Sequence, residues 1–182
     1  MSALSDNEIL KLFRDPFTKE EAFKLLLKKY QERLYWHIRR MVVSHEDTND
    51  LLQNISIKIW HALDKFREDS QLYTWLYRIA TNECLSFIEQ QKKKSTVSLS
   101  HDEAGYSERV RAEEYFDSQK LEWKLQLAIQ QLPEKQRVVF MLRYYEEMPY
   151  QQMSEVLGTS EGALKASYHH AAKKIEDYLL NH

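Results

Sequence analysis

The chain has 182 residues, of which 43% are hydrophobic and 12% aromatic, enough for one domain or two small ones to bury a core. Only three Gly and three Pro occur, which predicts an all-α protein and leaves little room for strands or glycine-rich phosphate loops. The net charge of −2 does not by itself indicate a nucleic-acid partner.

The sequence contains no apolar run that approaches the length of a membrane span, and the N-terminus lacks the basic and then apolar pattern of a signal peptide. We therefore expect a cytoplasmic protein with no direct membrane insertion. Cys84 is the only cysteine, so no internal disulfide or cysteine-based metal cluster can form, and we expect a buried thiol.

Residues 95–118 separate two helical regions. This segment is rich in Ser, Asp and Glu, carries more acidic than basic residues, and has no clear periodicity at its start. We interpret it as a flexible linker between a domain over residues 1–94 and a domain over residues 119–182. We also consider the hypothesis that its acidic residues compete with DNA for basic surfaces.

Four helices are predicted in the first domain, over residues 5–17, 20–43, 44–66 and 72–91, each with apolar residues at helical spacing. The third helix also has a polar side with Asp47, Asp50, Gln53 and Asn54. Trp60 lies beside this polar side, so it is either a core residue or an anchor for a partner protein.

The fourth helix is dense in aromatic residues, with Tyr73 and Tyr77 one turn apart and Trp75 between them. Polar and basic residues follow it, namely Arg78, Asn82, Lys92, Lys93 and Lys94. Aromatic rings beside basic residues are typical of single-stranded nucleic-acid binding. Burial in the core is the alternative, and we favour it for Trp75.

The second domain is predicted to contain helices over residues 121–132 and 133–145, followed by a helix-turn-helix motif over residues 149–175. Gly158 suits a left-handed helix end, and Ser160 can cap the next helix. The turn therefore has three residues, as in helix-turn-helix DNA readers.

The last helix divides its residues between two faces. Leu164, Tyr168, Ala171, Ile175 and Leu179 are assigned to the core. The opposite face has no acidic residue and carries Gly162, Lys165, Ala166, His169, His170 and Lys173, with Ser160 at the start of the helix. This face suits a phosphate-lined groove. A solvated face of an ordinary helical hairpin is the alternative.

No catalytic or metal site is predicted. His169 and His170 are adjacent, so they cannot both point toward one metal ion as an i, i+4 pair would, and the other histidines lack ligand spacing. Nucleophile, Walker and dinucleotide motifs are also missing from the sequence. We expect no enzyme activity, no metal and no cofactor.

Two separate segments together resemble one family, the bacterial extracytoplasmic-function (ECF) sigma factors of RNA polymerase. The first segment is DTNDLLQNISIKIWHALDKF followed by REDSQLYTWLYRIATNECLSFI, and it resembles the part that binds the polymerase and opens the promoter. The second is LPEKQRVVFMLRYYEEMPYQQMSEVLGTSEGALKASYHHAAKKI, which resembles the reader of the upstream promoter element.

The resemblance implies roles for particular residues. The polymerase-binding pattern falls on Asp47, Asp50, Leu51, Gln53 and Asn54, with Trp60 supporting the helix. The loop of Glu68, Asp69, Ser70 and Gln71 is the part that holds a base flipped out of the downstream element. Asn82 matches a position that contacts this element, beside Tyr73, Arg78 and Lys92 to Lys94.

The sequence departs from the family pattern at several positions. Asn49 and Asn54 replace acidic residues in the polymerase-binding region, and Ser167, His170 and Ala172 stand where the reader helix commonly has arginines. Arginine contacts guanine with two hydrogen bonds, whereas histidine offers one ring nitrogen at a time. The upstream sequence preference of other members therefore does not transfer to this chain.

The resemblance implies an alternative sigma factor that binds core RNA polymerase and directs it to two promoter elements. It also implies an anti-sigma factor as a partner, often one that is membrane-anchored. The alternatives are a stand-alone helix-turn-helix regulator and a helical interaction protein that does not bind DNA. The regulator would need neither the aromatic helix at residues 72–91 nor the polar face at residues 47–54.

Overall fold

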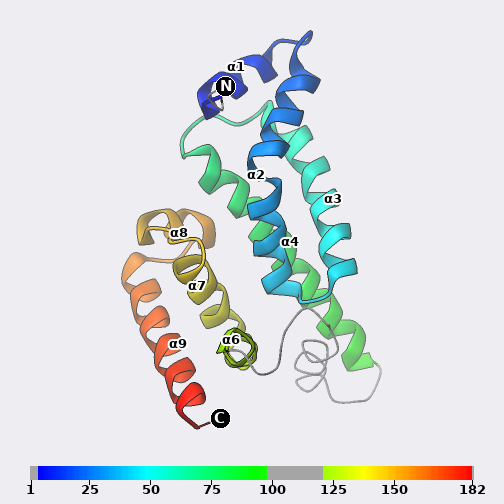
Figure 1. Cartoon of the computed structure of the whole chain (residues 1–182). Coiled ribbons are helices and arrows are strands. Elements are labelled where there is room, and N and C mark those ends of the chain that lie inside the picture. The colour runs from blue at the N-terminus through cyan, green and yellow to red at the C-terminus, as the bar shows by residue number, and fades with distance from the viewer. Residues whose placement is uncertain (1–3, 98–120, 182) are drawn as a thin grey trace.

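The computed structural model describes residues 4–97 and 121–181, and these residues form helices and no strands. The prediction of an all-α protein is therefore confirmed. The first group of helices is α1 (Asp6–Arg14), α2 (Lys19–Val42), α3 (His45–Leu63) and α4 (Leu72–Val97). The second group is α6 (Leu121–Gln130), α7 (Glu134–Tyr144), α8 (Tyr150–Leu157) and α9 (Glu161–Asn181). Figure 1 shows the two groups side by side.

Local capping signals set most helix boundaries in the first domain. The Ser5 side chain accepts a hydrogen bond from the Glu8 backbone, and the Glu8 carboxylate accepts one from the Ser5 backbone N–H, which forms a capping box at the start of α1. This helix ends at Arg14 rather than at residue 17, because Asp15 precedes a proline and is extended. The Ser44 hydroxyl accepts a hydrogen bond from the Asp47 backbone at 3.2 Å and caps α3 as predicted.

Helix α4 is longer than its pattern predicts and continues to Val97. Lysine is a good helix former, and Lys93 pairs with Glu89 one turn earlier at 2.8 Å, which favours the extension. The first three residues of the predicted linker are therefore helical. The remainder of that linker, residues 98–118, lies outside the described residues.

The helix-turn-helix follows the predicted boundaries. Gly158 ends α8 in the left-handed conformation with φ of 62°, and its N–H donates to the Ser154 carbonyl. The Ser160 hydroxyl then accepts from the Ala163 backbone at 3.4 Å as α9 begins. Pro133 and Pro149 precede α7 and α8 as their N-caps, one residue earlier than the first helical position expected for them.

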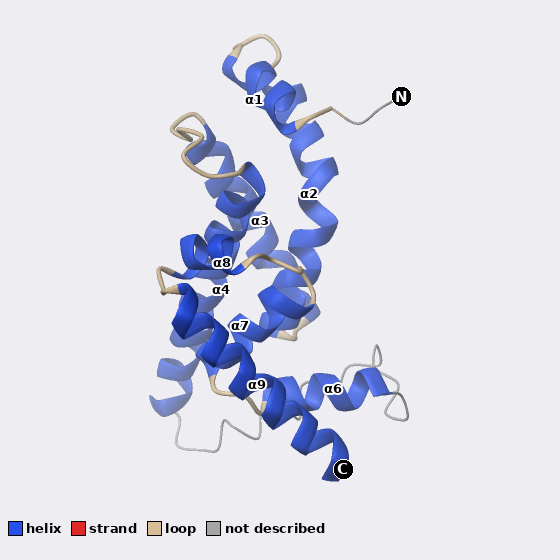
Figure 2. Cartoon of the chain, turned by 90° about the vertical axis from the view of Figure 1, so that its left-hand side faces the viewer, coloured by secondary structure: helices blue, strands red, loops and turns tan. Residues whose placement is uncertain are grey.

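Buried side chains of the two domains form one continuous cluster, because α8 packs on α4 and α7 approaches α2. Figure 2 views the molecule from the side that α8 and α9 cover. A smaller cluster joins Val43, at the end of α2, to Trp123 and Leu127 of α6. Val43 has φ of 68°, which is unusual for a β-branched residue, and it is buried at this junction.

Gly158 and Gly162 form a matched pair for testing the turn. A Cβ would meet nothing within 4 Å at either position, but only Gly158 has positive φ. Gly158→Ala should lower the free energy of unfolding by roughly 1–2 kcal/mol, whereas Gly162→Ala should raise it by up to roughly 1 kcal/mol. Urea unfolding of both variants measures the difference. Equal effects at the two sites would contradict the assigned backbone conformation.

Candidate DNA- and polymerase-binding surfaces

The outer face of α9 carries all the side chains predicted to read DNA. Gly162, Lys165, Ala166, His169, His170 and Lys173 are exposed, as is the capping Ser160. Tyr168 is half-buried and stacks on Phe140 of α7, with ring centroids 5.6 Å apart, so its assignment to the core side is confirmed. Lys165 Nζ lies 5.6 Å from the centroid of the Tyr150 ring and 3.9 Å from a Glu161 oxygen.

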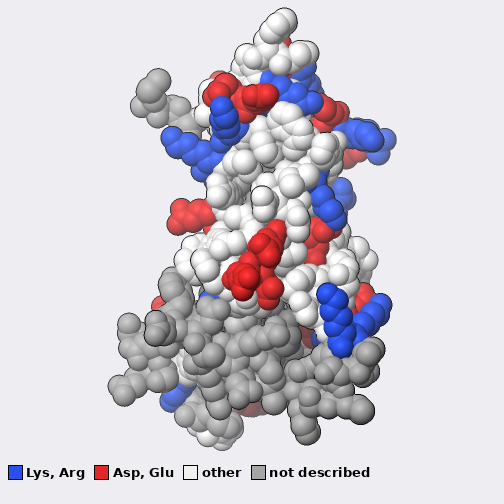
Figure 3. Space-filling view, turned by 90° about the vertical axis from the view of Figure 1, so that its right-hand side faces the viewer, with Lys and Arg blue, Asp and Glu red and all other residues white. Residues whose placement is uncertain are grey.

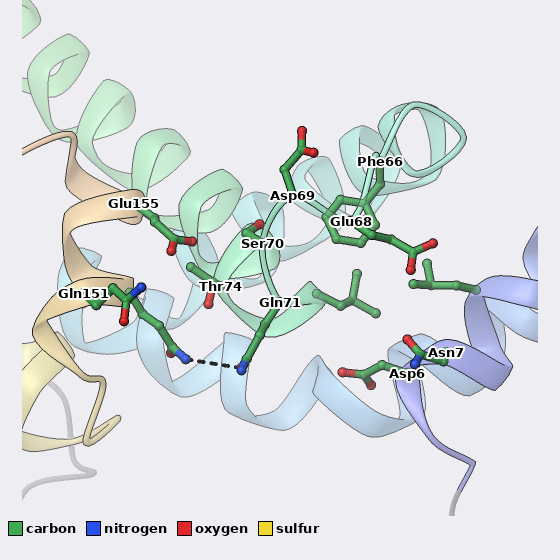
Figure 4. A pocket seen from close by; sticks show the side chains of 13 residues that line it. Asp6, Asn7, Phe66, Glu68, Asp69, Ser70, Gln71, Thr74, Gln151 and Glu155 are labelled. Atoms are coloured by element: carbon green, nitrogen blue, oxygen red, sulfur yellow. Dashed lines mark hydrogen bonds between the residues drawn. The ribbon is translucent and has the colours of Figure 1, made fainter.

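The loop from α3 to α4 borders a cavity of about 520 Å³. Glu68, Asp69, Ser70 and Gln71 line it together with Phe66, Thr74 and residues from α1 and α8 (Figure 4). Glu68 has φ of 61° and forms an ion pair with Arg14, so α1 holds the loop in place. Among the described residues the Thr74 hydroxyl, which is buried, has no hydrogen-bond partner.

The second domain closes one side of this cavity. Gln152 of α8 donates a hydrogen bond to the Gln71 side chain at 3.2 Å, drawn as a dashed line in Figure 4. Gln151 and Glu155, also from α8, line the cavity opposite the loop. The predicted base-holding loop therefore faces the helix-turn-helix of the same chain.

The polar and aromatic residues of α4 lie on two sides of the helix. Arg78 is exposed and lines a second hollow with Lys65 and Asp69, close to the loop. Tyr73 instead contacts Arg33 of α2, so the structure does not bring Tyr73 and Arg78 together. Trp75 is buried against Phe66, with ring centroids 5.1 Å apart, as favoured from the sequence.

The remaining candidates on α4 are exposed. Asn82 is exposed on the helix surface. The side chains of Lys92, Lys93 and Lys94 are also exposed, and Lys92 pairs with Glu134 of α7 at 2.5 Å. One residue of the predicted basic run therefore already contacts an acidic residue of the second domain.

The predicted polymerase-binding residues of α3 differ in exposure. Asp50, Gln53 and Asn54 are exposed and Asp47 is half-buried, whereas Leu51 is buried in the core. Figure 3 views the side that α3 covers and shows a compact group of acidic side chains there.

Trp60 packs edge-on against Phe13 and Phe23, with ring centroids 5.4 Å and 5.1 Å away. It is half-buried, so of the two interpretations left open from the sequence the structure favours core packing. Trp60 thus holds α1 and α2 against α3.

Sequence reasoning missed Ile57. Its side chain is 51% exposed, on the same side of α3 as Asp50 and Asn54. An exposed isoleucine among polar neighbours is an apolar contact point for a partner. The sequence does contain a signal for this exposure, because Ile57 does not share the helical spacing of the buried Ile55 and Ile59.

Sequence reasoning also missed a charged cluster where the domains meet. Glu146, just after α7, has a side chain only 6% exposed, and its Oε2 accepts a hydrogen bond from the Tyr77 hydroxyl at 2.6 Å. Arg33 Nη2 lies 3.4 Å from the same oxygen, and Arg40 Nη1 lies 3.6 Å from Oε1.

The phenols of this cluster remain hydrogen-bond donors at neutral pH. Burial, and then the Glu146 charge, raise the pKa of Tyr73 to about 12. The same two causes raise the pKa of Tyr77 further.

Neither a metal-binding group nor a membrane-spanning helix is found in the part of the chain that the structure describes. Within residues 4–97 and 121–181, no group of three or more His, Cys, Asp or Glu side chains is placed to hold a metal ion. None of the helices described is long and apolar enough to cross a membrane. Cys84 is buried as expected, and burial raises the pKa of its thiol.

Comparison with known proteins accounts for both halves of the chain. Residues 26–94 match the family described as Sigma-70 region 2, and residues 122–175 match Sigma-70, region 4. The chain is 30% identical over 168 residues to the RNA polymerase sigma-H factor of Pseudomonas aeruginosa, covering 88% of this chain and 87% of that protein. It is 29% identical to the ECF RNA polymerase sigma-E factor of Escherichia coli K12, covering 87% and 86%.

Two solved structures share the fold. One is the sigma factor RpoE in complex with the anti-sigma factor NepR from Bartonella quintana, with TM-score 0.69, 21% identity, and coverage of 86% of this chain and 96% of that chain. The other is CnrH in complex with the cytosolic domain of CnrY, with TM-score 0.71, 20% identity and 96% coverage of each chain. The chain thus belongs to the ECF family of RNA polymerase sigma factors, which bind core RNA polymerase and direct promoter-specific initiation of transcription.

Proposed function

We propose that the two domains divide promoter recognition between them. The first domain binds the polymerase through the exposed side of α3 and holds a flipped base of the downstream element with residues 68–71. The second domain reads the upstream element with the outer face of α9. The observation that carries this division is the pairing of an exposed α9 face that carries Lys165, Lys173 and two histidines with a separate cavity at the α3–α4 loop.

The cavity at the loop has features that suit a nucleobase. Phe66 offers an aromatic ring, and the Ser70 and Gln71 side chains offer donors and acceptors for a base edge. The buried Thr74 hydroxyl lacks a partner within the described residues, and a bound base could supply one. Flipping a base costs a few kcal/mol of stacking, so its capture would let binding energy help to open the duplex without ATP.

The upstream reader is proposed to rely on lysine and histidine. Lys165 and Lys173 suit phosphates, while His169 and His170 can each offer one ring nitrogen to a base edge. Gly162 and Ala166 leave room for close approach to the DNA. Such a reader gains less binding free energy per contact than a reader built from arginine, so we expect its affinity for DNA to depend largely on the polymerase.

We further propose that an anti-sigma factor regulates this chain, because one structure that shares its fold is a sigma factor bound to the anti-sigma factor NepR. That partner could be membrane-anchored, while this chain would act in the bacterial cytoplasm and at the nucleoid when active. The proposed function is recognition and assembly rather than catalysis, and it uses no cofactor or metal.

Run-off transcription tests the proposed function. Core RNA polymerase supplied with this protein should produce promoter-specific transcripts from fragmented genomic DNA of the source bacterium, and core alone should not. No transcript from any fragment, together with no binding to core, would overturn the proposal. A transcription factor that acts without replacing the sigma subunit would bind DNA, but in this assay it would give no transcript and no binding to core.

The reader face can be tested within the same assay. Lys165→Ala with His169→Ala should reduce transcription by roughly tenfold or more, since each lost contact costs about 1 kcal/mol, while binding to core is unchanged. Lys28→Ala, which removes an exposed lysine from α2, is the control and should have little effect. Loss of core binding in the double variant would mean that the α9 face is structural.

The polymerase-binding face is tested by Asp50→Lys and Ile57→Ala. Each should weaken core binding by roughly tenfold, because an anchor at an interface is typically worth more than 1 kcal/mol. Leu25→Ala on α2 removes another partly exposed aliphatic side chain and should leave the affinity unchanged. Titration with labelled core measures the affinity of all three variants. Equal affinities in the two α3 variants and the Leu25→Ala control would show that the interface does not lie on this side of α3.

A further inference from the structure

The cluster around Glu146 has the chemistry of a phosphate site. Two guanidinium groups and one phenol surround the two oxygens of a single carboxylate. The guanidinium groups and the phenol belong to the first domain, and the carboxylate belongs to the second. A backbone phosphate of DNA presents two non-bridging oxygens with a similar negative charge, and arginine binds such oxygens well. The Arg33 and Arg40 side chains are 53% and 25% exposed, so solvent and ligands can reach them.

An aromatic surface adjoins these arginines. The Arg33 guanidinium lies 4.7 Å from the centroid of the Tyr73 ring and donates to its hydroxyl at 3.3 Å. The ring centroids of the half-buried Tyr73 and the fully buried Tyr77 are 4.5 Å apart, so Tyr73 is the ring that the free chain exposes. Rings for stacking bases next to cations for phosphates are the parts of a single-strand binding surface. Tyr73 also lies in the first turn of α4, which follows the loop of residues 68–71, so one strand could reach both places.

Two more contacts show the second domain over the same surface. Glu134 of α7 pairs with Lys92, and Gln152 of α8 is hydrogen-bonded to Gln71. Together with Glu146, these contacts bring side chains of the second domain to the loop, to the aromatic start of α4 and to its basic end. Two of the three are carboxylates, which carry the charge that DNA would bring.

We propose that Arg33, Arg40, Tyr73 and Tyr77 form a binding site for a backbone phosphate of the single-stranded promoter, and that Glu146 occupies this site in the free chain. The inference rests on the proposed function, because it assumes that the first domain meets an opened promoter. DNA and Glu146 then compete for one site. A strand can bind only when the second domain moves away, and the free protein holds its own promoter surface closed.

The variant Glu146→Gln tests the competition. It removes the charge that holds the arginines and should raise the affinity for a fluorescein-labelled, random-sequence single-stranded DNA 20-mer by roughly tenfold. The reason is that apparent affinity scales with the fraction of open molecules. The dependence of log K on log salt should steepen by about 0.7, because one more phosphate is neutralised in each bound complex. Fluorescence anisotropy without polymerase measures both quantities.

Glu147→Gln is the matched control, because it removes the same charge from the adjacent, exposed residue. A gain in Glu147→Gln as large as in Glu146→Gln would overturn the proposal, since any lost negative charge would then suffice. Adding Arg33→Gln and Arg40→Gln to Glu146→Gln should abolish the gain. A gain that survives these changes would show that the arginines hold no phosphate and would also overturn it.

A cross-link covers the case in which Glu146→Gln does not fold. Cysteines placed at Gln71 and Gln152, whose side chains are in contact, can be joined by a reducible bismaleimide, while the native Cys84 is fully buried. The cross-linked chain should bind the single strand several-fold more weakly than the same chain after reduction. Equal binding would overturn the competition.

These assays are independent of the run-off result. Failure of run-off transcription together with a gain in Glu146→Gln would remove the proposed function and leave the competition in place. Promoter-specific transcripts without any gain in single-strand affinity in Glu146→Gln would remove the competition and leave the proposed function in place.

Discussion

The arrangement of the two domains depends on one buried carboxylate. Glu146 is held by Arg33, Arg40 and Tyr77, and its side chain is 6% exposed, so its charge is compensated within the protein rather than by water. Breaking such a buried pair by removing one partner leaves an uncompensated charge and is costly. Val43 also packs on Trp123 of α6, so α6 and the segment after α7 are both held against the first domain.

This constraint explains why the two proposed DNA-binding surfaces differ in accessibility. The reader residues of α9 are exposed, so the upstream reader needs no rearrangement to be reached. The α3–α4 loop and the start of α4 face the second domain and are partly covered by it. A chain built this way would bind little DNA alone, and a partner that separates the domains would make the downstream surface available.

Local signals made the helix-turn-helix predictable residue by residue. Gly158 and Ser160 act through their own backbone and side chain, and the burial of Leu164 and Ala171 follows from helical spacing alone. The end of α4 was less predictable, because good helix formers continued the helix into a segment whose composition indicated a linker. Leu51, which the resemblance places in the polymerase-binding pattern, is buried in the core, so its spacing also follows from helical packing.

The junction could not be predicted from the sequence because its partners are distant along the chain. Arg33 and Glu146 are 113 residues apart, and neither stands in a pattern that indicates a contact. Ile57 and Glu146 both lie outside the helical spacing that identifies core residues, yet Ile57 is exposed and the Glu146 side chain is enclosed. Glu146 is enclosed because α7 packs against α2, and helical spacing carries no information on that contact.

The central claim is that the domains are held together in the free chain and separate when the promoter surface is used. A distance distribution between spin labels at exposed positions of α3 and α9, measured by pulsed electron resonance, tests this most directly. The account predicts one narrow distribution for the free protein and a longer distance when core RNA polymerase and single-stranded DNA are added. An unchanged distribution in a transcriptionally active complex would contradict it.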